Sequence, residues 1–102
     1  MPLIADTPES PYYAVIFTST RTENDDGYHD MAARMAELAS KQPGFLGMES
    51  AAGITICYWS DLKSISAWKT NLEHREAQRL GREKWYSTFR TRICKVEREY
   101  GT

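Results

Sequence analysis

The amino-acid sequence predicts one α+β domain with the split βαβ pattern of the ferredoxin-like fold, a βαββαβ order with a four-stranded antiparallel sheet. First, hydrophobic patterns along the 102 residues give the order strand, helix, strand, strand, helix, strand. Second, only a short glycine turn separates the two middle strands, which makes them a hairpin. Third, a chain of this length supports a single core. In one compact domain this order places both helices on one face of the sheet.

The first predicted strand spans residues 12–21 and follows an irregular arm. Three of the four prolines fall in residues 1–11, so we expect a disordered or draped arm there and the folded domain in residues 12–102. The strand is rich in β-branched and aromatic residues and almost wholly apolar in its first half, as in a strand covered on both faces. Turn residues follow, and Asp25 or Asp26 is the expected N-cap of the next helix.

An amphipathic helix is predicted over residues 27–42. Its apolar positions recur at helical spacing and are Tyr28, Met31, Ala32, Met35, Leu38 and Ala39. Pro43 ends this helix, and strands over residues 44–51 and 54–60 flank the turn at Gly53. The second of these strands is apolar on both faces, so we expect it in the interior of the sheet.

The second helical region is predicted in two pieces. Asp61 caps a short helix, which ends near Asn71 because asparagine tolerates the left-handed conformation that ends helices. The inward-facing residues of this helix are expected to be Leu62, Ile65 and Trp68. A second piece covers about residues 72–86. The last strand alternates over residues 87–100, which is long compared with the usual length of about five or six residues and is typical of a strand that reaches beyond its own subunit.

The composition argues against several classes of partner. A net charge of −1 with 26% charged residues provides no basic surplus for nucleic acid. The local basic residues Arg75, Arg79, Arg82 and Lys84 are interleaved with Glu73, Glu76 and Glu83, which is typical of a solvated helix face. No apolar run approaches the roughly 20 residues of a membrane span, and the first residues lack the pattern of a signal peptide. We therefore expect a cytoplasmic protein that binds neither nucleic acid nor membrane.

The cysteines and histidines predict no metal site. Cys57 and Cys94 both lie in apolar strands, and two buried thiols are favoured over a disulfide in a chain with no export signal. The sequence contains no CxxC, HExxH or paired-histidine spacing.

The bare face of the sheet is expected to be an interface. Because aromatic and aliphatic side chains occur on both faces of the strands, the face without helices must also be covered. A second copy of the chain would cover it, so we expect a homodimer that buries at least about 2,000 Å² in total.

The candidate site lies where the second helical region breaks. His74, Gln78, Gly81 and Trp85 share one helical face, and the glycine forms a notch that admits another backbone or a ligand. His74 is the candidate general base, with a helix-capping or surface role as the alternative. Gln78 is a candidate substrate-binding residue.

The three tryptophans are candidate lining residues of a small-molecule pocket. Trp59, Trp68 and Trp85 either contact a ligand or belong to the core, since large aromatics serve both purposes. A helix broken at Asn71 cannot lie flat on the sheet, so a cavity is expected between the strands and Trp68, His74 and Trp85.

The segment from residue 58 onward resembles the antibiotic biosynthesis monooxygenases, a family of dimeric α+β barrel proteins that also includes the haem-degrading monooxygenases. The resemblance covers the chain from about residue 12. It rests on the Gly-Phe-Leu-Gly start of the second strand at residues 44–47, the strand that ends in Trp59, the helical segment at residues 61–68, and His74 six residues later.

The resemblance implies a cofactor-independent monooxygenase that acts on a small aromatic or quinol-type compound. An electron-rich phenol that has lost its proton can transfer an electron to oxygen directly, so the protein supplies a base and a dry pocket. Two alternatives remain open: a non-catalytic small-ligand binding or stress-associated module, and a different reaction on the same scaffold.

The resemblance does not extend to the haem-degrading members. These proteins use an asparagine on the first strand, a tryptophan on the second helix and a histidine about ten residues later. Trp68 matches the tryptophan, but Thr18 and Ser19 stand near the asparagine position and Gln78 stands at the histidine position. Because an amide is a poor iron ligand compared with imidazole, we expect no haem and no other cofactor.

Overall fold

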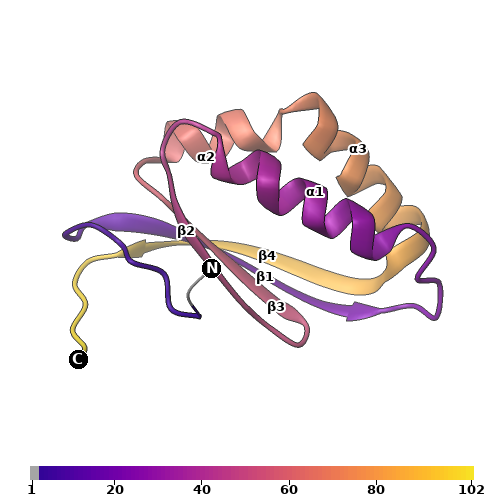
Figure 1. Ribbon diagram of the computed structural model, residues 1–102, viewed down its shortest axis with the longest axis horizontal. Coiled ribbons are helices and arrows are strands. Elements are labelled where there is room, and N and C mark those ends of the chain that lie inside the picture. The colour runs from indigo at the N-terminus through magenta and orange to yellow at the C-terminus, as the bar shows by residue number, and fades with distance from the viewer. Residues whose placement is uncertain (1–2) are drawn as a thin grey trace.

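The structure is a four-stranded antiparallel sheet with its helices on one face (Figure 1). The computed structural model describes residues 3–102. The elements are β1 (Tyr12–Arg21), α1 (Tyr28–Ser40), β2 (Phe45–Ala51), β3 (Ile54–Trp59), α2 (Leu62–Lys69), α3 (Leu72–Leu80), a π-helical turn (Gly81–Trp85) and β4 (Tyr86–Val96). The strand order is β2-β3-β1-β4, so β3 is an interior strand. The predicted ferredoxin-like α+β fold is confirmed.

The register of the strands defines two faces of the sheet. In β1, Tyr13 pairs with Trp59 of β3, and Val15 pairs with Cys57. Trp59 lies on the side of the helices, because its ring is 6.3 Å from that of Trp68 in α2. Residues that are paired across antiparallel strands point to the same side, so these positions form the helix-facing side. The alternate positions form the opposite side, which we call the bare face.

The core has a larger part between the sheet and the helices and a smaller part on the bare face, where Tyr12 and Ala14 are buried. Trp59 is fully buried, and the Phe45 ring packs edge-on against it at 5.4 Å. Ala39 of α1 and Ile65 of α2 are buried on the same side. Leu62 is 54% exposed, so the prediction that it faces inward is wrong: it occupies the first turn of α2, and one turn later Ile65 fills the space above the sheet.

The N-cap predicted for α1 is also wrong. The capping position is Gly27, with φ 76°, and no side chain caps the helix. Asp25 is unavailable because its carboxylate accepts a hydrogen bond from Arg21 at 2.8 Å. Asp26 instead uses its backbone carbonyl oxygen, which accepts a hydrogen bond from the indole N–H of Trp85 at 2.9 Å.

The predicted helix break near Asn71 is confirmed, but its cause differs from the one expected. Asn71 has φ −57° and ψ 130°, which is not left-handed. Its side-chain oxygen accepts a hydrogen bond from the backbone N–H of His74 at 3.1 Å. Asparagine therefore begins α3 as its N-cap and does not end α2.

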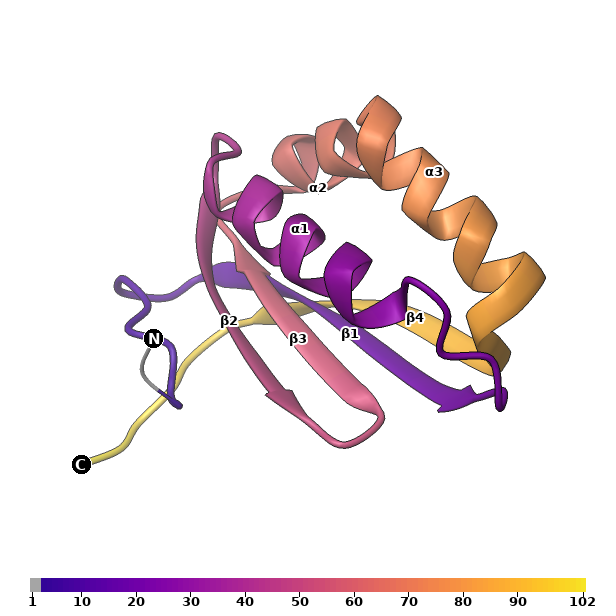
Figure 2. The same cartoon turned by 45° about the vertical axis from the view of Figure 1, so that its right-hand side comes forward.

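The two end segments of the chain run on the side of the sheet away from the helices (Figures 1 and 2). Residues 1 and 2 of the predicted arm lie outside the described residues. Farther along, the backbone N–H of Ala5 donates to Glu49 at 3.0 Å. The Tyr12 hydroxyl donates to Glu99 and lies 2.9 Å from the Thr7 hydroxyl. The last strand ends at Val96, four residues earlier than predicted, and Glu99 joins the arm and not the sheet.

The two cysteines have different environments, and both are free thiols. Burial raises the pKa of the Cys57 thiol to about 11. Cys94 is exposed in β4, so the prediction of two buried thiols is wrong for this residue. In residues 3–102, no helix has both the length and the apolar character that crossing a membrane requires.

Gly44 is expected to be intolerant of any side chain. Its φ is 84°, and an added Cβ would collide with the side chain of Ser64 in α2. We expect Gly44→Ala to lower the free energy of unfolding by about 1 to 3 kcal/mol, measured by urea denaturation. Gly101→Ala is the matched control, because an added Cβ there meets nothing within 4 Å. Equal stability of the two variants would contradict this packing of β2 against α2.

Candidate functional site

His74 and Trp68 form a stacked pair at the junction of α2 and α3. Their ring centroids lie 4.1 Å apart, and the ring planes differ by only 12°. His74 Nδ1 also lies 2.9 Å from the backbone carbonyl oxygen of Trp68. Because the stack and the hydrogen bond join the same two residues, the imidazole is fixed in position and orientation, and it is half-buried.

The contact with the Trp68 carbonyl determines which nitrogen of His74 carries the proton. A carbonyl oxygen can only accept, so Nδ1 is the protonated nitrogen and donates this hydrogen bond. The other nitrogen, Nε2, then carries a lone pair and has no hydrogen-bond partner among residues 3–102. Burial lowers the pKa of His74, and its hydrogen bond to the Trp68 carbonyl opposes this only in part. At neutral pH the ring is therefore an uncharged base.

The predicted aromatic residues fall into two groups. Trp59 lies beneath Trp68, at 6.3 Å between ring centroids, so Trp59, Trp68 and His74 form a continuous aromatic column from β3 to α3. Trp85 is 3% exposed and packs edge-on against Tyr28 of α1 at 5.6 Å. Trp85 thus belongs to the contact of the π-helical turn with α1, and the column contains two of the three tryptophans.

The π-helical turn explains why Trp85 leaves the line of His74 and Gln78. A π turn is wider than an α-helical turn, so α-helical spacing from His74 no longer predicts the direction of a residue beyond Leu80. The glycine notch predicted at Gly81 is filled by the chain itself, because a Cβ there would lie 2.8 Å from the ring of Tyr86. Neither another backbone nor a ligand occupies it.

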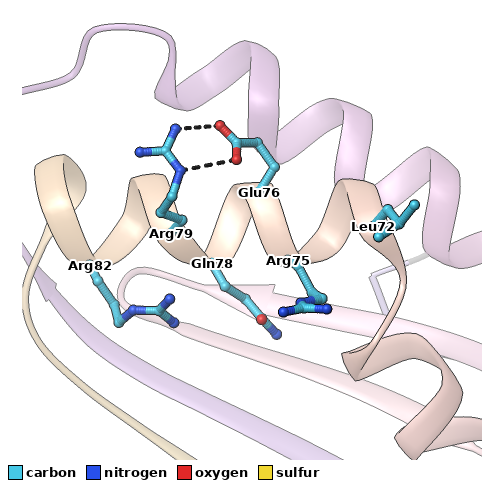
Figure 3. A pocket seen from close by; sticks show the side chains of 6 residues that line it. All are labelled: Leu72, Arg75, Glu76, Gln78, Arg79 and Arg82. Atoms are coloured by element: carbon cyan, nitrogen blue, oxygen red, sulfur yellow. Dashed lines mark hydrogen bonds and ion pairs between the residues drawn. The ribbon is translucent and has the colours of Figure 1, made fainter.

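A hollow of about 320 Å³ lies along α3. Its lining residues are Leu72, Arg75, Glu76, Gln78, Arg79 and Arg82. Figure 3 shows Arg75, Gln78 and Arg82 projecting from α3 toward the strands, whereas Glu76 and Arg79 project away from them. His74 does not itself line the hollow; it lies one helical turn before Gln78, which does.

The helix-facing side of β4 remains open. Phe89 stacks on Phe17 at 5.6 Å, and Ile93 pairs with Val15, so both point toward the helices. They are nevertheless 42% and 54% exposed. Figures 1 and 2 show α3 held above the sheet on the side where β4 forms the edge. The candidate site is therefore the hollow along α3, together with the exposed apolar residues on the helix-facing side of β4.

Arg75 and Arg82 are site residues that the sequence analysis assigned to a solvated helix face. Part of their signal was present in the sequence, because Arg75 and Gln78 are three residues apart on one helical stripe, whereas Arg82 lies in the π-helical turn, which the sequence did not predict. Among the residues that the structure describes, no group of three or more His, Cys, Asp or Glu side chains is placed to hold a metal ion.

Comparison with known proteins places this fold in a recognised class. The chain superposes on a Nitrosomonas europaea protein named as a putative antibiotic biosynthesis monooxygenase, with 12% identity, a TM-score of 0.65, and coverage of 89% of this chain and 94% of that one. It also superposes on SnoaB, a cofactor-independent oxygenase from Streptomyces nogalater, with 15% identity, a TM-score of 0.63, and coverage of 90% and 97%. The chain therefore has the α+β fold of the antibiotic biosynthesis monooxygenases.

A sequence relative defines the family within this fold. The uncharacterized protein YqjZ of Bacillus subtilis is 46% identical over 104 residues, which cover 97% of this chain and 91% of that protein. This chain belongs to the YqjZ family. No protein-family model matches it.

Two substitutions of His74 separate its structural role from its role as a base. We expect His74→Ala to cost about 1 to 3 kcal/mol of unfolding free energy, because it removes both the stack and the hydrogen bond to Trp68. His74→Asn places an amide N–H near the position of Nδ1, so we expect a smaller loss. Urea denaturation of both variants measures the difference, and equal losses would contradict the hydrogen bond.

The pH dependence of stability, compared between the wild type and His74→Asn, tests the pKa of His74. The pKa is lowered in the folded state, so the unfolded chain binds a proton at the ordinary value of 6.5 while the folded chain does not. The contribution of the neutral imidazole to stability is thus complete above this pH and is lost as the pH falls below it. We expect the stability advantage of the wild type over His74→Asn to shrink between about pH 7.5 and pH 5. An advantage that grows on acidification would contradict the burial of His74.

Proposed function

We propose that the protein is a cofactor-independent monooxygenase that acts on a small aromatic or quinol-type compound bound between α3 and β4. The observation that carries the proposal is the protonation and tautomeric state of the His74 imidazole. Its ring is neutral, its tautomer is set by the Trp68 carbonyl, and Nε2 is available to accept a proton. A base of this kind suits proton abstraction from a phenol near neutral pH.

The proposed reaction balances without a cofactor. Nε2 of His74 takes the phenolic proton, and the electron-rich phenolate reduces O₂ by one electron. The two radicals combine, which forms a C–O bond, and the resulting hydroperoxide loses water to give a quinone. The substrate supplies all the electrons, one oxygen atom enters the product, and the other leaves as water. The apolar side chains of Phe89 and Ile93 would support the aromatic body and limit access of water to it.

The comparisons support the proposal through the shared fold. SnoaB, which shares the fold, is named as a cofactor-independent oxygenase. At 15% identity the similarity concerns the fold, and one fold hosts many chemistries. The case for this chain therefore depends on His74 and on the open side of β4. A module that binds a small ligand without turnover, or a different reaction on this scaffold, would use the same space.

Oxygen uptake tests the proposed activity. We expect uptake above the uncatalysed rate with at least one member of a panel of phenols and quinols, and incorporation of one atom from ¹⁸O₂ into the product. We expect His74→Asn to lower kcat/KM by at least about tenfold, near 1.4 kcal/mol, because the variant keeps a donor to the Trp68 carbonyl but lacks the base. Ligand-induced stabilisation without uptake would favour the binding module, and full activity of His74→Asn would contradict the role of His74.

We also propose a homodimer formed through the bare face of the sheet. Ile54 is 41% exposed on this face, and Ile16 and Ile56 beside it are half-buried. This apolar surface would be covered by a second copy.

Sedimentation equilibrium tests the dimer. We expect a dimer at micromolar concentration, because an interface of at least about 2,000 Å² is typical of permanent association. A monomer at that concentration would contradict the proposal. Ile54→Lys is expected to weaken the dimer without loss of secondary structure, because this side chain is already partly exposed in the single chain.

A further inference from the structure

We propose that the site binds an anionic aromatic compound, whose carboxylate or similar acidic group is held by Arg75 and Arg82. This inference rests on the proposed function and specifies the class of its substrate. It follows from the way in which the charged residues of α3 are sorted between the two sides of the helix.

Arg79, on the side away from the strands, is neutralised. It forms ion pairs with Glu76 and Glu83, which lie one turn before and one turn after it. Glu73 is also occupied, because it accepts two hydrogen bonds from Arg34 of α1 at 3.0 Å. The three glutamates of this helical region therefore all bind arginines other than Arg75 and Arg82.

Arg75 and Arg82, on the side of the strands, have no such partner. Within residues 3–102, neither side chain forms a hydrogen bond or an ion pair, and no carboxylate lies within 4 Å of either guanidinium. The glutamates that are close to Arg75 and Arg82 in the sequence thus do not pair with them in the structure. The two arginines of this helical region without an ion-pair partner among residues 3–102 are those that project toward the strands.

The geometry of the stripe suits one anionic group. Arg75 in α3 and Arg82 in the π-helical turn are about two helical turns apart. Figure 3 shows the Gln78 amide between the two guanidinium groups, and all three polar ends lie at a similar depth below α3. An oxyanion at this position could accept from both guanidinium groups, which bind carboxylates in a planar, paired manner, and from the amide N–H of Gln78.

The opposite wall suits the aromatic body of the same molecule. Phe89 and Ile93 present exposed apolar surface on the helix-facing side of β4, and Arg75 and Arg82 project toward the strands from the helical side. Such a site would hold a planar ring against the strand and its acidic group against the helix. The same guanidinium groups would also stabilise the phenolate that forms when His74 takes the proton, so charge on the ligand and charge in the reaction favour the same residues.

A matched pair of probes tests the inference. 1,4-Dihydroxy-2-naphthoate and 1,4-dihydroxynaphthalene share one ring system and differ by a single carboxylate. Binding of each is measured by isothermal titration calorimetry without oxygen, with the wild type, Arg75→Gln, Arg82→Gln and Arg98→Gln. Arg98→Gln is the control in this series, because Arg98 is an exposed arginine that follows β4 and does not line the hollow.

We expect the wild type to bind the carboxylate at least about tenfold more tightly than the uncharged compound. Arg75→Gln and Arg82→Gln should each weaken binding of the carboxylate by about tenfold and leave the uncharged compound unaffected, since charge-assisted hydrogen bonds are lost only for the anion. Arg98→Gln should change neither affinity. Equal affinity of the wild type for the two probes, absence of binding, or an equal effect of all three substitutions would overturn the inference.

Two further readings separate this inference from the proposed function. If the carboxylate binds as expected but oxygen, once admitted, is not consumed, the anion site stands and the monooxygenase proposal fails. If both probes bind with equal affinity and both are oxidised once oxygen is admitted, the monooxygenase proposal stands and the anion site fails. If Arg75→Gln and Arg82→Gln weaken the dimer in sedimentation equilibrium instead of ligand binding, these arginines pair with a second copy of the chain, which would also overturn the inference.

Discussion

The contact between His74 and Trp68 is the constraint on which the site depends. The α2 and α3 helices are short, with eight and nine residues, and they meet at a break. Asn71 fixes the backbone of that break by accepting the His74 N–H, and the imidazole completes it by stacking on Trp68 and donating to its carbonyl oxygen. Trp68 in turn lies over Trp59, the fully buried residue of β3. The direction of α3 is thereby tied to the centre of the sheet, and the same hydrogen bond that completes the break sets the tautomer of the candidate base.

The direction of α3 determines what the rest of the site contains. Because α3 is held above the edge of the sheet formed by β4, Phe89 and Ile93 remain exposed on the helix-facing side, where side chains of a closed core would be buried. Arg75, Gln78 and Arg82 project toward the strands, and within residues 3–102 neither arginine has an ion-pair partner, because the glutamates of the helical region bind Arg34 and Arg79. The direction of α3 thus determines the positions of a base and of two cations. The arrangement suits an acidic aromatic molecule that must lose a proton.

Local patterns predicted the fold because the sequence signal of each helix, strand and turn is contained in a few neighbouring residues. The amphipathic stripe of α1, the glycine turn between β2 and β3 and the break at Asn71 are all properties of neighbouring positions. Predictions failed where several groups compete for one partner: Asp25 does not cap α1 because Arg21 binds its carboxylate, and Gly81 admits no ligand because the Tyr86 ring fills its notch. Arg75 and Arg82 were missed for a related reason. Along the sequence they are balanced by glutamates, and only the fold shows that those glutamates pair with Arg34 and Arg79. His74 and Trp68 were identified as candidates from the sequence, but their stacking depends on the angle between two helices, which no local pattern contains.

The most direct test of this account is the protonation state of His74 itself, measured by ¹⁵N nuclear magnetic resonance of the imidazole ring as a function of pH. The account predicts that at neutral pH Nδ1 carries the proton and Nε2 has the shift of an unprotonated nitrogen, which is the opposite of the tautomer that free histidine prefers. It also predicts a midpoint below the ordinary value of 6.5, because burial disfavours the charged ring. A ring protonated on Nε2, or a midpoint above that value, would show that the Trp68 carbonyl does not hold His74 as a base, and the proposed chemistry would have no proton acceptor.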